Sequence, residues 1–137
     1  MKVKEVMHSI TKLPSHTTIV DAAIAMDKKT IGSILVEENC ETIGIVTERD
    51  ILRKIVAKGR DPSKVAIKEI ASNPLITVDE NATLAEASEK MAKQNIRRLV
   101  VTSGNKIVGV ITTRDVSNNV NYLLAKGATA YLPSYYP

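Results

Sequence analysis

The segment Gly44-Ile45-Val46-Thr47-Glu48-Arg49-Asp50 returns along the chain as Gly109-Val110-Ile111-Thr112-Thr113-Arg114-Asp115. Comparing residues 18–50 with residues 83–115 without a gap gives ten identical positions out of 33. A repeat of this extent predicts two copies of one structural unit. Such copies usually pack against each other, because neither can bury its apolar face alone. Upstream of it, Lys4–Met7 resembles Lys68–Ala71 once a single residue is inserted.

Each copy predicts a strand, a helix, a pair of hairpin strands and a second helix. For the first copy we expect a strand at Ile10–Leu13, a helix opened by Thr18-x-x-Asp21, strands at Ile31–Val36 and Ile43–Val46, and a helix from about Arg49 to Lys58 that stops at Gly59. For the second copy the equivalents are Leu75–Val78, Thr83-x-x-Glu86, Ile96–Val101, Ile107–Ile111, and Arg114 to Lys126 with a stop at Gly127. A threonine followed three residues later by a carboxylate is the pattern of a capping box.

The predicted fold class is therefore α/β with an α+β-like order of elements: two tandem β-α-β-β-α units around a pseudo-twofold axis. We expect unit 1 at residues 1–62, unit 2 at residues 63–126 and a tail at residues 127–137. The tail carries three tyrosines and two prolines. It is either a disordered end or a segment whose tyrosines cover apolar surface.

Composition narrows the class of protein. No apolar run approaches the ~20 residues of a membrane helix, and Cys40 is the single cysteine of the 137 residues, so neither a spanning segment nor a disulfide framework is expected. A cytoplasmic protein is the simplest interpretation. The net charge of +4 is spread evenly over both halves, and Phe and Trp are missing. Nucleic-acid binding is therefore disfavoured, because it usually needs clustered cations and stacking aromatics.

The repeated string itself leaves two interpretations open. Thr47-x-x-Asp50 and Thr112-x-x-Asp115 can be simple capping boxes at helix starts. They can also be parts of a ligand site, because free amides at a helix start attract anions. Gly44 and Gly109 favour the second interpretation, since glycine weakens a strand unless backbone or ligand must come close.

With these motifs the chain resembles a cystathionine-β-synthase-type (CBS) domain pair, or Bateman module, over residues 1 to about 126. The resemblance implies that AMP, ADP or ATP binds as a regulatory ligand in two clefts between the paired units, with no other cofactor. It implies that Asp50 and Asp115 accept hydrogen bonds from ribose hydroxyls. Thr47 and Thr112 would bond the ribose or the first phosphate.

The resemblance also implies an apolar adenine slot in each cleft. Val110 and Thr11 would belong to the cleft of Asp115, whereas Ile45 and Ile76 would belong to the cleft of Asp50. For all four residues, plain packing in the core is the alternative.

The two copies differ most where one has Gly32-Ser33 and the other has Arg97-Arg98. By the resemblance, these positions contact ligand phosphates. Without it, the arginines would keep a strand edge in solvent. Arg49 and Arg114 stay open between a ligand phosphate and an ion pair at a subunit interface.

Other reactive residues suggest no chemistry. His8 and His16 are expected to be surface histidines without metal-ligand spacing, and Cys40 has no evident activating partner. We expect no catalytic residue, no metal site and no enzyme activity.

The leading hypothesis is a stand-alone, non-catalytic sensor of adenosyl ligands that signals energy or metabolite state to a protein partner in trans. Apolar residues on the second helices predict a homodimer. One alternative is a nucleic-acid-binding module that uses the basic surface. The other is a purely structural dimerisation module.

Overall fold

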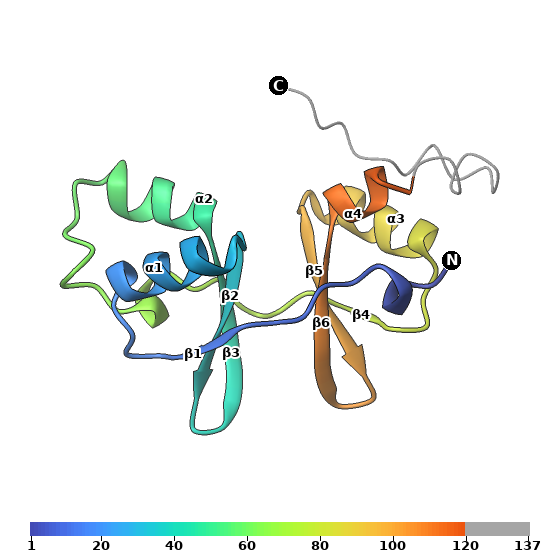
Figure 1. Ribbon diagram of the computed structural model, residues 1–137, viewed down its shortest axis with the longest axis horizontal. Helices are drawn as coiled ribbons and strands as arrows, with labels where there is room; N and C mark the ends of the chain where they lie inside the picture. The colour runs from blue at the N-terminus through green and yellow to red at the C-terminus, as the bar shows by residue number, and fades with distance from the viewer. Residues whose placement is uncertain (120–137) are drawn as a thin grey trace. The chain divides into compact units, whose positions relative to one another are not determined.

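In a computed structural model, which describes residues 1–119, each copy of the repeat forms a three-stranded sheet with its helices against one face (Figure 1). The first copy contains β1 (Lys12–Pro14), α1 (Ile19–Lys29), β2 (Ser33–Glu38), β3 (Glu41–Thr47) and α2 (Glu48–Ile51), which continues as a π-helical segment, Leu52–Val56. The second contains β4 (Thr77–Asp79), α3 (Leu84–Gln94), β5 (Arg98–Ser103), β6 (Lys106–Thr112) and α4 (Thr113–Ser117). The predicted β-α-β-β-α order and the mixed α and β class are confirmed.

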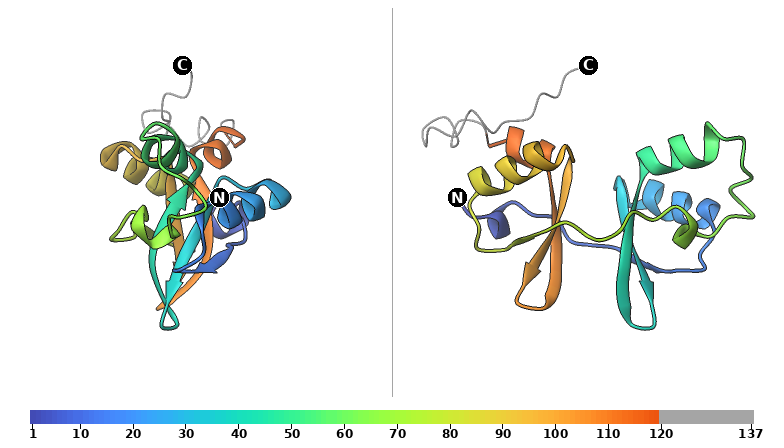
Figure 2. Two further views of the ribbon diagram at one scale, coloured as in Figure 1. Left: turned by 90° about the vertical axis from the view of Figure 1, so that its left-hand side faces the viewer. Right: turned by 180° about the vertical axis from the view of Figure 1, so that it is seen from behind.

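The sheets have the same topology. In each, the first strand runs parallel to the second, which is antiparallel to the third. Both views of Figure 2 show the hairpin strands reaching beyond the helices of their own copy. The β2–β3 turn places Asn39 and Cys40 at φ angles of 52° and 64°, and the β5–β6 turn places Gly104 at 60°. These left-handed conformations fit the predicted short hairpins.

The first strand of each copy starts two residues later than predicted. Only Lys12–Pro14 align with Leu35–Glu37, and only Thr77–Asp79 align with Val100–Thr102. The apolar residues predict an earlier start for both strands. Strand pairing begins only where the neighbouring strand, β2 or β5, lies alongside, and hydropathy does not show that point.

The helix starts follow the sequence. Thr18 Oγ1 accepts a hydrogen bond from the Asp21 N–H at 3.2 Å, and Thr83 Oγ1 accepts one from the Glu86 N–H at 3.1 Å. Gly59 has a φ of +66°, as a helix-ending glycine should. The predicted extension to Lys126, the stop at Gly127 and the tail lie outside the described residues. No helix within residues 1–119 has the length and apolar character needed to cross a membrane.

The buried core of the described residues is aliphatic, as the composition predicted. One cluster gathers around Ile19, Ile34 and Ile55, and the other around Leu84, Met91 and Ile111. Small residues, Ala22 and Ala87, are fully buried where α1 and α3 face their sheets.

The segment that precedes the first strand of each copy, here called its leading segment, packs with the other copy. Residues Ile10–Leu75 form one unit, and Met1–Ser9 packs with residues 76–119 in the other. Val3 is buried beside Leu84, whereas its repeat equivalent Ile67 is buried beside Ile19. A boundary at residue 62 thus separates the two sequence copies but not the two packing units. Hereafter the Asp50 unit is residues 10–75 and the Asp115 unit is residues 1–9 with 76–119.

Candidate functional site

The Asp50 unit places Thr47 and Asp50 in direct contact at the junction of β3 and α2. Thr47 Oγ1 accepts from the Asp50 N–H at 3.2 Å, and Asp50 Oδ2 accepts from the Thr47 N–H at 2.9 Å and from its hydroxyl at 3.0 Å. Asp50 Oδ1 faces Lys54 Nζ at 3.3 Å. The carboxylate therefore uses one oxygen for the helix start and the other for a cation.

The Asp115 unit repeats this arrangement with a histidine in place of the lysine. Asp115 Oδ2 accepts from the Thr112 N–H at 2.8 Å and from its hydroxyl at 3.0 Å. Asp115 Oδ1 pairs with the Nε2 atom of His8. The Asp115 side chain is only 7% exposed, whereas the imidazole is 66% exposed.

The capping interpretation of both Thr-x-x-Asp strings is confirmed, because each forms a reciprocal capping box. The capping hydrogen bonds engage only one oxygen, Oδ2, of each carboxylate. In each, Oδ1 takes no part in the helix start and faces a side chain that a ligand could replace.

Both strand glycines are explained by a close backbone approach. A Cβ at Gly44 would lie 2.9 Å from the Ser72 carbonyl oxygen, and a Cβ at Gly109 would lie 2.7 Å from the His8 carbonyl oxygen. These contacts belong to short antiparallel bridges that join Ser72 to Ile45 and His8 to Val110. Packing of the leading segments therefore accounts for the glycines, which carry less weight as evidence for a ligand than the sequence suggested.

The register of each hairpin places Gly32-Ser33 and Arg97-Arg98, the dipeptides that differ between the copies, beside the capping boxes. Ser33 lies directly across from Thr47, and Arg98 lies directly across from Thr112. The Gly32 carbonyl oxygen accepts from the Glu48 N–H at 3.0 Å, and the Arg97 carbonyl oxygen accepts from the Thr113 N–H at 3.0 Å. Each dipeptide thus adjoins the threonine and aspartate of its own unit. Arg97 is exposed and Arg98 is half-buried.

The four predicted adenine-slot residues divide between the units. Thr11 and Ile45 lie in the Asp50 unit, where the Thr11 carbonyl oxygen accepts from the Leu35 N–H at 2.8 Å and Ile45 is half-buried. Ile76 and Val110 lie in the Asp115 unit, where the Ile76 carbonyl oxygen accepts from the Val100 N–H at 3.0 Å and Val110 is 8% exposed. Their assignment to particular clefts stays a prediction.

His8 is the residue that sequence reasoning missed. The predicted surface position of His8 is confirmed, because its imidazole is 66% exposed, but His8 also pairs with a predicted ribose-binding carboxylate. The signal was present in the leading-segment match, which places His8 opposite Ser72 when it is extended by one residue. Because the leading segments are exchanged, that position lies beside the other copy's repeated string.

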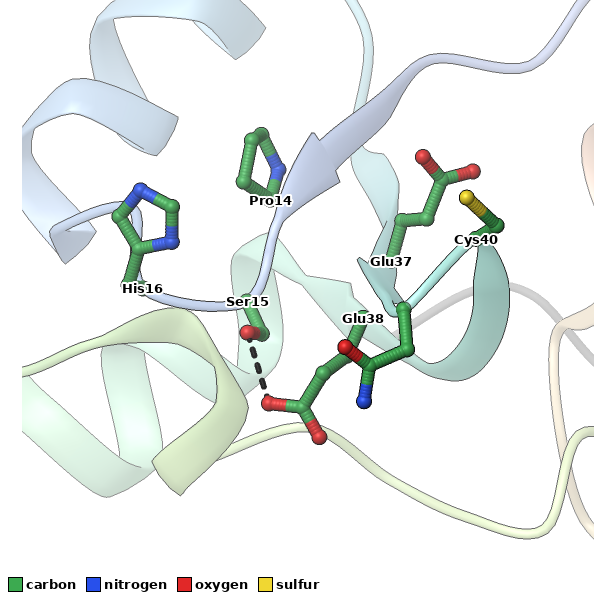
Figure 3. A pocket seen from close by; sticks show the side chains of 7 residues that line it. Pro14, Ser15, His16, Glu37, Glu38 and Cys40 are labelled. Atoms are coloured by element: carbon green, nitrogen blue, oxygen red, sulfur yellow. Dashed lines mark hydrogen bonds between the residues drawn. The ribbon is translucent and has the colours of Figure 1, made fainter.

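A separate pocket of about 290 Å³ lies at the end of β3 away from Thr47, between the end of β1 and the β2–β3 turn (Figure 3). Ser15 Oγ donates to Glu38 Oε1 at 2.9 Å there, and His16 and Cys40 are among the residues that line the pocket. Among the described residues, no group of three or more His, Cys, Asp or Glu side chains could hold a metal ion. None of the residues that line this pocket belongs to the repeated string.

The sequence model described as CBS domain matches residues 3–57 and again residues 67–122. The chain belongs to the CBS domain family. The CBS domain-containing protein YhcV of Bacillus subtilis is 33% identical over 118 residues, which cover 85% of this chain and 84% of YhcV. The protein MK0525 of Methanopyrus kandleri is 40% identical over 118 residues; the match covers 85% of this chain but only 60% of that relative's length.

Solved CBS structures have the same fold. The CBS domain protein PAE2072 from Pyrobaculum aerophilum, complexed with AMP, matches with a TM-score of 0.82 and 30% identity over 94% of this chain and 100% of that one. A hexameric CBS-CP12 protein from bloom-forming cyanobacteria matches with a TM-score of 0.83 and 28% identity over 90% of this chain and 74% of that one.

Proposed function

We propose that this CBS domain pair is a regulatory module that binds an adenosyl ligand, AMP, ADP or ATP, reversibly and without catalysis. The observation that carries the proposal is the duplicated Thr–Asp pair, in which each carboxylate keeps Oδ1 outside the helix cap. The AMP complex of PAE2072, a protein similar over nearly the whole chain, supports the choice of ligand.

The chemistry of the two pairs suits a ribose. A carboxylate oxygen accepts hydrogen bonds from hydroxyl groups, and a threonine hydroxyl both donates and accepts. We propose that ribose hydroxyls replace Lys54 at Asp50 Oδ1 or His8 at Asp115 Oδ1. Arg97 and Arg98, which adjoin Thr112, would then hold phosphate oxygens through charge-assisted hydrogen bonds. Ser33, across from Thr47, offers a neutral hydroxyl in the other unit.

A thermal-shift panel of AMP, ADP, ATP, S-adenosylmethionine and NAD tests the proposal, with GMP as the control for base recognition. A ligand at 100 times its dissociation constant stabilises the fold by about 2.7 kcal/mol. For a chain of this size, the unfolding midpoint should rise on the order of 10 °C. If no adenosyl compound moves the midpoint at millimolar concentration, the proposal fails. Steeply salt-dependent binding of DNA or RNA would instead favour the nucleic-acid alternative.

We also propose that the module works as a homodimer. Leu52 and Val56, one turn apart, are 59% and 65% exposed, although Ile55 between them is buried in the core. A helix with apolar side chains on an outer face is expected to bury them against a partner. The protein that receives the signal and the cytoplasmic location both stay predictions.

A further inference from the structure

The carboxylate of Asp115 is fully engaged in this structure. Thr112 supplies two hydrogen bonds to Oδ2, and His8 occupies Oδ1. Because the side chain is only 7% exposed, a ligand hydroxyl must displace one of these groups to reach it. The Thr112 bonds are part of the start of α4, whereas the imidazole of His8 is 66% exposed. His8 is therefore the group that leaves most easily.

The backbone of His8 is held by two hydrogen bonds, while its imidazole is largely exposed. The His8 N–H donates to the Val110 carbonyl oxygen at 2.9 Å, and the Val110 N–H donates to the His8 carbonyl oxygen at 3.0 Å. Gly109 permits this approach, because a Cβ there would lie 2.7 Å from the His8 carbonyl oxygen. The imidazole thus stays within reach of Asp115 even after a ligand has displaced it.

The Asp50 unit has a different competitor at the same place. Ser72 makes the equivalent backbone bridge, with bonds to Ile45 of 2.9 and 3.1 Å. The cation at Asp50 Oδ1 is Lys54, which comes from the same helix. A lysine keeps its charge from pH 5 to pH 8, whereas an imidazole changes charge within that range.

We propose that His8 competes with the ligand for Asp115 Oδ1, so that binding at Asp115 weakens as the pH falls from 7.5 to 5.5 while binding at Asp50 does not. An imidazolium holds a carboxylate more tightly than a neutral imidazole does, because its hydrogen bond is charge-assisted. The inference rests on the proposed function, since it concerns ligand binding at the same carboxylate.

The other charged groups on the elements around this pair are lysines, arginines and glutamates. The segment of His8 carries Lys4 and Glu5, β5 begins at Arg98 directly after Arg97, α4 carries Arg114, and β6 carries Lys106 at its far end. The helix α3, which packs against α4, carries Glu86, Glu89, Lys90 and Lys93. Lysine and arginine stay protonated, and an ordinary glutamate stays ionised, above pH 5.5. The second histidine of the chain, His16, lies in the Asp50 unit.

Titration calorimetry of the full chain at pH 5.5, 6.5 and 7.5 tests the inference, with adenosine as the probe because the AMP phosphate itself titrates near pH 6. In Asp50→Ala, which leaves the Asp115 site, adenosine affinity should rise about five-fold from pH 5.5 to pH 7.5, because the His8 partner of the pair is largely exposed and such pairs contribute little more than about 1 kcal/mol. Adding His8→Gln should remove this dependence and tighten binding at pH 5.5. Asp115→Ala, which leaves the Asp50 site, is the matched control and should show no change with pH.

Two results would overturn the inference: a pH profile that His8→Gln leaves unchanged, or weaker binding in His8→Gln at every pH, which would make His8 a contributor instead of a competitor. Absence of adenosine binding in every protein at every pH would contradict the proposed function itself. A measurement without ligand then still tests the pair. In a double-mutant cycle of His8→Gln and Asp115→Asn, the coupling in unfolding free energy should be larger at pH 5.5 than at pH 7.5, and equal coupling at both values would refute the role of protonation.

Discussion

Lys54 connects the capping carboxylate of Asp50 to the exchanged leading segment. Its Nζ atom lies 3.3 Å from Asp50 Oδ1 and donates a hydrogen bond to the Ile70 carbonyl oxygen at 2.9 Å. In the Asp115 unit the repeat equivalent is Asn119, whose amide donates to the Asp115 backbone carbonyl oxygen at 2.8 Å. The repeat-equivalent residues Lys54 and Asn119 therefore differ in what they contact: Lys54 reaches the Asp50 carboxylate, and Asn119 bonds only to the Asp115 backbone.

The Lys54→Met variant should lower the free energy of unfolding by about 1 kcal/mol, because it removes the bond to Ile70 but keeps an apolar stem. Urea unfolding measures the loss. Lys58→Met, at an exposed position further along the chain, is the control and should change stability by less than about 0.5 kcal/mol. Equal effects of the two substitutions would show that Lys54 has no structural role.

The Gly109→Ala variant should lose about 1–3 kcal/mol of stability, because its Cβ would lie 2.7 Å from the His8 carbonyl oxygen and 2.8 Å from Met7 Sδ. Amide hydrogen exchange at Val110 should accelerate as its bridge to His8 opens. Gly104→Ala is the control. Its φ of +60° makes alanine strained, but nothing lies within 4 Å, so exchange at Val110 should stay slow. Unchanged exchange in Gly109→Ala would contradict the close-approach explanation.

The two ligand sites should differ in their affinity for phosphates. At pH 7.5, Asp115→Ala should remove the tighter AMP or ATP site in calorimetry, and Asp50→Ala should leave it largely intact, because Arg97 and Arg98 adjoin Thr112. A charge-assisted hydrogen bond is worth about 1.5–3 kcal/mol, so Arg98→Ala should weaken AMP binding roughly 10- to 150-fold and adenosine binding far less. Loss of the tight site in Asp50→Ala would show that the arginines serve the other carboxylate.

The proposed dimer should depend on Leu52 and Val56. The double variant Leu52→Glu/Val56→Glu should scatter light as a 14.9 kDa monomer and stay folded, since both side chains are exposed within the chain. Ile24, 49% exposed on α1, provides the control, and Ile24→Glu should leave the dimer intact. A dimer that survives the double substitution would place the interface elsewhere.

The sequence by itself determined the order of elements and the residues of the repeated string. Helix caps, hairpin turns and strand alternation depend on neighbours a few residues apart, so Thr18, Asn39 and Gly59 could be interpreted locally. Because the chain repeats, each element could be predicted from two related segments. The proximity of Ser33 to Thr47 and of Arg98 to Thr112 follows from the register of a predicted hairpin.

Tertiary structure alone decided which leading segment packs against which sheet. Val3 and Ile67 have the same pattern of neighbours in the sequence, and only the path of the chain sends each to the other copy's core. That exchange explains Gly44 and Gly109, and it brings His8 to a carboxylate 107 positions away. No local rule predicts such a contact, because the contact depends on where distant backbone segments meet and not on the preferences of the residues themselves.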